Sequence, residues 1–167
     1  MAAPICPTCQ TPARLTNGAE IYPHRSDLTA LRIWKCDVCP NAYVGCHPGT
    51  EDALGTPAGP ELRKARITLH HSRIDPLWRK ADQCGAYQPE DARARKQIQR
   101  AARTRVYAYL ADKMSLTTDE THTGMFSIEQ CREAWRVLTG VTYPQIRAWA
   151  HQREAPKTTK PKKRKAA

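Results

Sequence analysis

The chain lacks the features of a membrane or secreted protein, and it has few residues from which to build a large apolar core. One Phe occurs among its 167 residues, beside four Trp and six Tyr. No run approaches the roughly 18 consecutive apolar residues of a membrane-spanning helix. The opening MAAPICPTC has no apolar stretch resembling a signal peptide. We therefore expect a cytoplasmic protein with a modest core and no membrane partner.

Acidic residues are missing from two stretches of the sequence. The formal net charge is +11, and the last eleven residues, KTTKPKKRKAA, hold five Lys and one Arg. A second acid-free run, RARKQIQRAARTR, spans residues 93–105. Two such regions favour a polyanionic partner, and nucleic acid is the first candidate inside a cell. The alternative is a basic end that only keeps the chain in solution. The side chains predicted to contact phosphates here are Arg93, Arg95, Lys96, Arg100, Arg103, Arg105, Lys160, Lys162, Lys163, Arg164 and Lys165.

Seven cysteines occur, an odd number that a complete set of disulfides does not use. In a chain without a signal peptide a disulfide framework is not expected. Cys6, Cys9, Cys36 and Cys39 instead form two C-x2-C pairs separated by 26 residues. Four thiolates with no open position describe a structural zinc site. We predict one structural zinc ion held by these cysteines; buried thiols or a redox pair are the alternatives.

The residues between and after the cysteine pairs predict short strands. Asn17 and Gly18 form a two-residue turn signal of type I′, flanked by strand-like stretches. AYVGC, which follows the second cysteine pair, is short and apolar and predicts a third strand. Cys46 and His47 at its end point to opposite faces of a strand. We expect Cys46 to be buried, which leaves His47 for another role.

Beyond residues 48–60, a Pro- and Gly-rich loop, the pattern becomes helical. Helices are predicted at 60–74, about 90–114, 127–138 and about 144–153. We expect the first to stop at Asp75, because a residue before proline avoids the helical region, and Asp75 to cap the turn that follows. Ser127 and Gln130 match a capping box. The sequence therefore predicts an α+β fold with three parts: a zinc ribbon of short antiparallel strands (1–50), packed on a mainly helical region (51–154), and a disordered basic tail (155–167).

Five short motifs occur in a fixed order: CPTC, WKCDVCPNAYVGCH, LGTPAGPELRKAR, HHSRIDPLW and HTGMFSIEQCR. Together they resemble a zinc-finger-containing domain family of unknown function that recurs in phages and bacterial prophage regions, over roughly residues 4–138. The resemblance implies a ribbon with zinc at the four cysteines, followed by helices, without an established activity. It also implies recurring polar positions at His47, Arg63, Arg66, His71, Asp75 and His122. The chain departs from the pattern at Ile74, where Phe is usual, and at Ser127, where an acidic residue is usual.

The histidines and Asp75 permit a second interpretation, a reactive site. His47, His70, His71, Asp75 and His122 are a set from which an acid–base pair or a second metal site can be built. His71 and Asp75 are four residues apart and share a face if the helix continues. Asp75 is equally explained by capping, and the histidines by contact with water.

Two further groups of residues bear on this interpretation. Arg63 and Arg66 lie one turn apart and could hold a phosphate, so we also predict that they contact nucleic acid; the alternative is a solvated face. A second zinc ion could use Cys46, His47 or His122 with Cys131. Neither group matches a known nuclease motif.

The first interpretation is a zinc-stabilised nucleic-acid-binding protein, serving a phage or prophage as an accessory or regulatory protein in the cytoplasm of a bacterial or phage-infected cell. A metal-assisted nuclease or phosphate-directed hydrolase is the second. A module that binds a host protein through the ribbon is the third. We expect a binding protein rather than an enzyme, and the sequence leaves DNA and RNA undistinguished.

Overall fold

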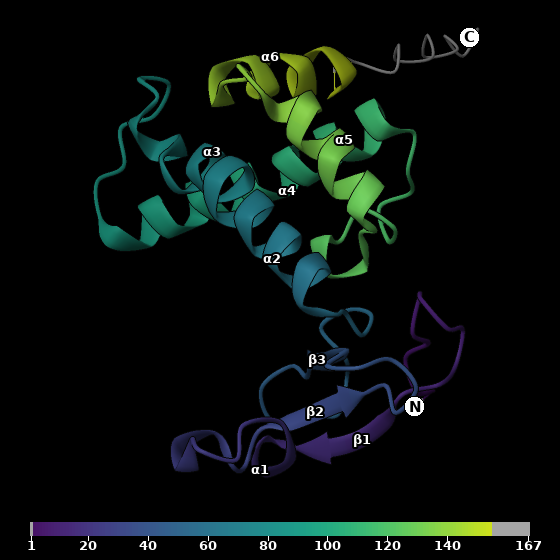
Figure 1. The fold of residues 1–167 in the computed structure, drawn as a ribbon. Coiled ribbons are helices and arrows are strands. Elements are labelled where there is room, and N and C mark those ends of the chain that lie inside the picture. Colours follow the sequence, from purple (N-terminus) through teal and green to yellow (C-terminus); the bar gives the residue numbers. More distant parts are fainter. Residues whose placement is uncertain (1, 155–167) are drawn as a thin grey trace, which may run out of the picture.

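The computed structural model describes residues 2–154 and shows the predicted α+β fold, a small sheet followed by helices (Figure 1). The tail, with its predicted disorder and phosphate contacts, lies outside the described residues. Within residues 2–154, no helix combines the length and apolar character that crossing a membrane requires. In chain order the elements are β1 (Arg14–Asn17), α1 (Gly18–Ile21), η1 (Ser26–Leu28), β2 (Arg32–Lys35), β3 (Tyr43–Gly45), α2 (Pro60–Leu69), η2 (His70–Ile74), α3 (Asp75–Arg79), η3 (Ala81–Gln83), α4 (Ala92–Met114), η4 (Thr123–Met125), α5 (Ile128–Leu138) and α6 (Tyr143–Glu154).

The three strands form an antiparallel sheet in the order β1-β2-β3. The third strand was predicted and is β3, but the prediction of a two-residue turn at Asn17 and Gly18 is wrong. Asn17 ends β1 and caps α1, because its side-chain oxygen accepts the N–H of Ala19 at 3.0 Å. Asparagine is among the best helix N-caps, so the same dipeptide suits either structure. The chain returns to the sheet only at Arg32.

The segments α2, η2 and α3 form one continuous helical stretch, so the predicted stop at Asp75 is wrong. Asp75 has helical angles (φ −58°, ψ −44°), and its N–H bonds the carbonyl of His70. This i to i+5 bond makes η2 a π-helical turn. Pro76 follows in the first turn of α3, where a missing N–H is tolerated. Asp75 therefore caps nothing through its side chain, which is free to bond elsewhere.

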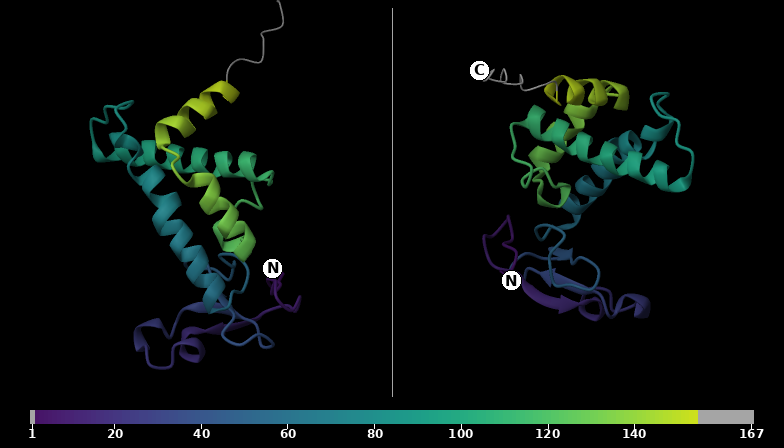
Figure 2. Two further views of the ribbon diagram at one scale, coloured as in Figure 1. Left: turned by 45° about the horizontal axis from the view of Figure 1, so that its top comes forward. Right: turned by 180° about the vertical axis from the view of Figure 1, so that it is seen from behind.

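Helix α4 is central to the helical part, and α3, α5 and α6 all pack on it (Figures 1 and 2). Ala102, Val106 and Leu110 form its buried stripe. The one Phe of the chain, Phe126, is fully buried in the same core. Helix α5 begins with the capping box predicted from Ser127, which orients it toward this core. The main apolar core therefore lies among the helices.

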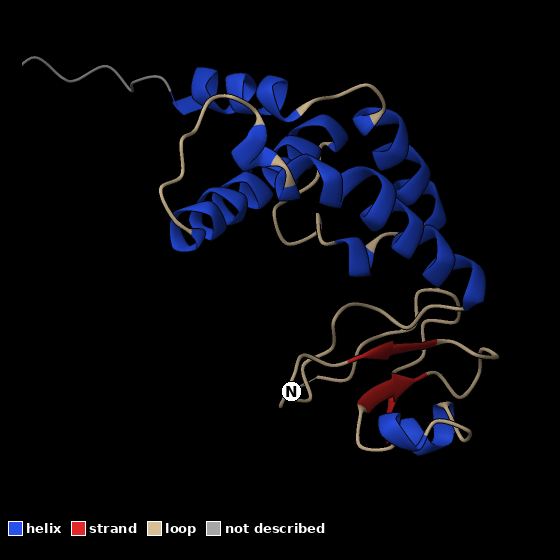
Figure 3. Cartoon of the chain, turned by 90° about the vertical axis from the view of Figure 1, so that its left-hand side faces the viewer, coloured by secondary structure: helices blue, strands red, loops and turns tan. Residues whose placement is uncertain are grey.

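Two loops meet between the ribbon and the helices: the loop from β3 to α2, which links the two parts of the chain, and the loop from α4 to α5 (Figure 3). The N–H of Thr56 in the first loop donates to the carbonyl of Gly124 in the second at 2.9 Å. Gly55 and Gly124 approach so closely that a β-carbon on either would overlap backbone atoms of the other loop. We call this region the junction; it holds the ribbon against the helices through backbone contacts.

Candidate metal centre

Two turns of the ribbon bring four cysteine sulfurs to one point. Cys6 and Cys9 lie in the turn before β1, and Cys36 and Cys39 in the turn between β2 and β3. Each turn is closed by a backbone hydrogen bond from its first cysteine. Because β1 and β2 are antiparallel neighbours, the start of β1 lies beside the end of β2. The sheet register therefore places the two turns next to each other.

The sulfur positions fit a tetrahedral zinc ion. Sγ of Cys9 and Cys36 are 3.4 Å apart, and Sγ of Cys6 and Cys39 are 3.9 Å apart. All four sulfurs lie within 4.8 Å of one another. Zinc–sulfur bonds of about 2.3 Å in a tetrahedron require sulfur–sulfur distances of about 3.8 Å. The N–H of Cys39 also points at Sγ of Cys36 (3.3 Å), as suits a thiolate ligand.

The four thiols are not all deprotonated at neutral pH unless a cation binds between them. Hydrogen bonds from Thr11 lower the pKa of Cys9 to about 6. Burial raises the pKa of Cys36 and brings that of Cys39 to about 12. A bound dication reverses this situation, because its charge deprotonates a coordinating thiol. The four cysteines are therefore expected to become four thiolate ligands only when a divalent metal ion binds.

The ribbon depends on this site for its core. Its buried cluster consists of Cys6, Cys36 and Ala42, with Cys9 and Cys39 packed against it. So small a cluster stabilises little, whereas zinc binding contributes on the order of 10 kcal/mol in apparent free energy. With four protein ligands and no open position, the ion is structural. The prediction of one structural zinc ion at Cys6, Cys9, Cys36 and Cys39 is confirmed.

The structure assembles no second metal site in the part of the chain that it describes. Within residues 2–154, no further set of three or more His, Cys, Asp or Glu brings its ligand atoms together. Cys46 is half-buried, not buried as predicted, and lines a small cavity of about 190 Å³ with exposed His47. Cys131 belongs to the helical core, away from the ribbon cluster. The alternative second zinc site therefore has no support.

Asp75 bonds a different histidine from the one predicted. Asp75 is buried, and its carboxylate lies 3.0 Å from Nδ1 of His70. It accepts a hydrogen bond from Nε1 of Trp78 and forms an ion pair with Arg79, each at 3.0 Å. His71, the predicted partner, is exposed. The π-helical turn explains the difference, because it stacks residues five apart, whereas in an α-helix they lie about 140° apart.

Arg63 and Arg66 connect the ribbon to the helices. Arg66 is buried and donates to the carbonyls of Phe126 and Thr56, each at 2.9 Å. The Arg63 guanidinium stacks 3.9 Å from the ring centre of Tyr43 and donates to two backbone carbonyls of the ribbon and its following loop. Both guanidinium groups are committed to the junction, so we remove them from the predicted phosphate contacts.

His122 lies at the junction, near His47 and His70, two of the histidines that the sequence analysis grouped with it. Its Nδ1 accepts the N–H of Gly124 at 3.2 Å and so caps η4. Partial burial lowers its pKa, and so do electrostatic interactions with Arg103, His47 and His70. The structure therefore brings His122 and His47 into one neighbourhood with His70 rather than with His71.

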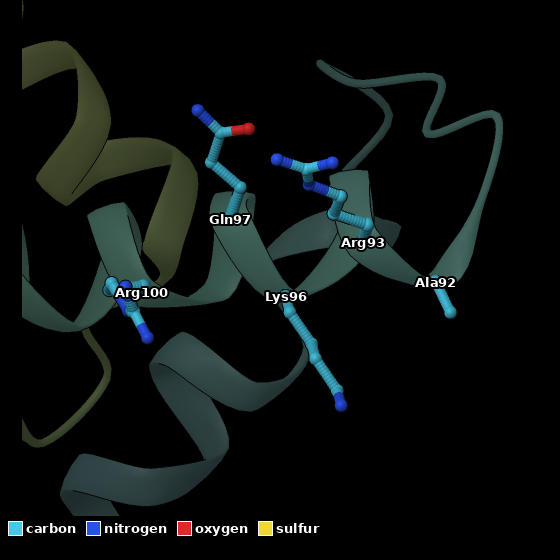
Figure 4. Close-up of a pocket in the computed structure, with 5 residues that line it drawn as sticks. All are labelled: Ala92, Arg93, Lys96, Gln97 and Arg100. Atoms are coloured by element: carbon cyan, nitrogen blue, oxygen red, sulfur yellow. The ribbon is translucent and has the colours of Figure 1, made fainter.

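The predicted basic run forms most of α4, and three of its cations lie on one open face. Arg93, Lys96 and Arg100 are exposed and line a shallow hollow with Ala92 and Gln97 (Figure 4). Among residues 2–154, none of the three cations forms an ion pair. They lie outside the buried stripe of α4. We call these three residues the α4 basic face.

The other arginines of the run have neighbours in the protein. Arg95 pairs with buried Asp82 at 3.3 Å. Arg105 donates to the hydroxyl groups of Tyr87 and Tyr143. Arg103 is exposed but lies over the rings of Trp78 and Tyr107. Arg95 and Arg105 therefore contribute to packing, while Arg103 remains accessible. These three assignments were not predicted, because each depends on a partner from another element.

Comparison with known proteins agrees with this metal centre. The sequence profile of a zinc-finger-containing domain matches residues 2–141. No curated protein and no solved structure matches the chain. The match covers most of the sequence and includes all four zinc ligands, so the chain belongs to the family of zinc-finger-containing domains.

Proposed function

We propose that the chain binds nucleic acid through the α4 basic face, while zinc maintains the ribbon. The observation that carries the proposal is the exposure of Arg93, Lys96 and Arg100 on one face without a carboxylate partner among the described residues. Their spacing of three and four residues aligns them along the helix. The span of seven residues is about 10 Å, which is the rise of about three nucleotides along one strand.

The position of these cations lowers the stability of α4 when no ligand is bound, and it favours the binding of an anion. Arg93 lies in the first turn of α4, where the helix dipole is positive; the N-cap Asp91 accepts the N–H of Ala94, but the first turn itself has no acidic residue. Like charges one turn apart also repel, by a few tenths of a kcal/mol for each pair. A polyanion along this face relieves both effects. Phosphate contacts of this kind are independent of sequence.

The tail adds a second group of cations to the proposal. Lys160, Lys162, Lys163, Arg164 and Lys165 neutralise phosphates and release counterions when the chain binds. We further propose an accessory or regulatory role for the chain in a phage or prophage, because its motifs resemble a family that recurs there.

The test compares two variants of the zinc-loaded protein that lose the same charge. The first variant has Gln in place of Arg93, Lys96 and Arg100. The second variant has Gln in place of Lys64, Arg132 and Arg136. These three control residues are exposed beside the groove between α2 and α5. Fluorescence anisotropy measures the Kd for duplex DNA and for RNA at low salt.

We expect the first variant to bind at least about tenfold more weakly, since each phosphate contact contributes to affinity, and the second to bind nearly as the wild type does. Equal weakening of both variants would show that only net charge matters. No binding by the wild-type protein would also contradict the proposal.

A further inference from the structure

Several groups that can donate to an anion gather around Tyr107 at the junction. The Tyr107 hydroxyl lies 3.4 Å from Nε2 of His70 and 3.3 Å from Oγ1 of Thr123. The Arg103 guanidinium, one turn earlier on α4, lies 5.8 Å from the centre of the Tyr107 ring. His122 directly precedes Thr123. Three segments that are distant in sequence thus meet at one tyrosine.

The residues that act most strongly on His122 are all basic. Arg103, His47, His70 and Arg66 act on its ring, and each disfavours a positive charge there. The nearby carboxylate, Asp75, is buried and already bonded to His70, Trp78 and Arg79. Arg103, His47 and His122 are exposed. The junction therefore presents positive charge to the solvent without a free carboxylate from this group of residues.

The hydrogen bond to Nδ1 of His122 fixes the tautomer of its neutral ring. Because its Nδ1 accepts the N–H of Gly124, the proton of the neutral ring lies on Nε2. Hydrogen bonds to an anion are roughly twice as strong as those between neutral groups. A neutral His122 beside a fully charged Arg103 is thus a suitable donor pair for a phosphate oxygen.

Arg103 also continues the line of the α4 basic face. It lies three residues beyond Arg100, so Arg93, Lys96, Arg100 and Arg103 follow one another at intervals of three or four. The full line covers about 15 Å of helix and ends at the junction. We infer that the junction binds a phosphate group of the nucleic acid that follows α4, through Arg103 and Nε2 of His122, with His47 at the side of the ribbon. This inference rests on the proposed function.

Two substitutions separate the donor role of His122 from its capping role. In His122→Asn, the side-chain oxygen replaces Nδ1 as the acceptor for Gly124, but no donor stands at the place of Nε2. In His122→Gln, an amide donor returns near the place of Nε2 while the cap is lost. Arg103→Gln removes the charge. His24→Asn, at an exposed histidine between β1 and β2, is the matched control.

The probes are inorganic phosphate and a short single-stranded oligonucleotide, with and without a 5′-phosphate, added to the zinc-loaded protein. We expect His122→Asn and Arg103→Gln each to weaken oligonucleotide binding by about tenfold or more, as loss of a charge-assisted contact does. His122→Gln should retain part of the affinity, and His24→Asn all of it. A preference for the 5′-phosphorylated strand would identify a strand end; equal affinity for both strands would identify an internal phosphodiester.

The outcomes distinguish this inference from the proposed function. If the Gln variant of the α4 basic face loses affinity while both junction variants bind like the wild type, the junction site is wrong and the α4 interface stands. If no oligonucleotide binds the wild type but inorganic phosphate shifts the His122 ring signals in NMR spectra, the phosphate site stands and the proposed function fails. A merely structural His122 would be rescued by Asn, whereas the donor role is rescued by Gln.

Discussion

Gly55 and Gly124 show at the scale of single residues how the ribbon is attached. Each lies where a β-carbon would overlap the backbone of the opposite loop. The same loops share the hydrogen bond from Thr56 to Gly124 and the contacts of Arg66 with Thr56. A side chain at Gly124 would therefore separate the loops and strain several bonds together.

We predict that Gly124→Ala lowers the free energy of unfolding by about 2 kcal/mol or more, within the range for forced overlap in a packed region. Urea denaturation of the zinc-loaded protein measures the effect. Gly45→Ala is the control, because a β-carbon there meets only the Leu54 side chain at 3.6 Å. Equal stability of the two variants would mean that the junction tolerates a wider spacing.

The zinc ligands permit a prediction about protons. In the metal-free site Cys36 has a raised pKa and Cys39 a pKa of about 12, so both thiols are protonated at pH 7. Zinc binds thiolates, so binding must release these protons and must weaken as the pH falls. Calorimetry in buffers of different ionisation enthalpy should show at least two protons released per zinc ion at pH 7. Release of fewer than two would exclude thiolate coordination by both residues.

Single-residue predictions succeeded where one local pattern determined the role. The four zinc ligands follow from C-x2-C spacing alone, and Ser127 follows from its own capping box. The partner of Asp75 does not, because the choice between His70 and His71 depends on whether the helix contains a π-helical turn. Arginine is usually exposed, so the sequence alone favours a surface position for Arg66. Only the tertiary structure shows that Arg66 donates to two backbone carbonyls.

At the scale of elements, the ribbon and the helices have separate cores. The ribbon cluster contains the zinc ligands, while the helical cluster gathers side chains from α2 to α6. Zinc therefore stabilises β1, β2 and β3 directly, and α4 and α5 only through the junction. The elements should respond differently to loss of the metal.

We predict that chelation of zinc unfolds the ribbon and leaves most of the helical structure in place. Amide hydrogen exchange measured by mass spectrometry should show loss of protection in residues 14–45 after EDTA treatment. Protection in the centre of α4 should persist, because its buried stripe contacts no zinc ligand in the core clusters. Uniform loss of protection would mean that the two cores fold as one cooperative unit.

Elements with a long periodic pattern were predictable from sequence. Helices α4, α5 and α6 begin and end within about two residues of the predicted limits, a normal uncertainty for helix ends. The short elements were not predictable in this way. Helix α1 forms because Asn17 acts as its N-cap, but the dipeptide Asn17-Gly18 is equally compatible with a hairpin turn. The continuous run from α2 to α3 was missed because Pro76 normally ends a helix, and the π-helical turn accommodates it.

At the scale of the whole molecule, the uneven charge is the feature that bears on function. The net charge is +11, and the last eleven residues account for +6 of it. In the described part, Arg93, Lys96 and Arg100 of the α4 basic face are exposed, and Figure 4 shows the Arg93 and Lys96 side chains extending away from each other. Two basic regions on one chain can each bind part of the same polyanion, which raises the overall affinity.

The salt dependence of binding tests the central claim most directly, that Arg93, Lys96 and Arg100 bind phosphates. Anisotropy titrations with duplex DNA at several salt concentrations give the slope of log Kd against log salt concentration. Three lost phosphate contacts should make this slope shallower by about 2 to 3 in the variant with Gln at all three positions. The control variant with Gln at Lys64, Arg132 and Arg136 should keep the wild-type slope. Identical slopes for the wild type and the α4 variant would contradict the account.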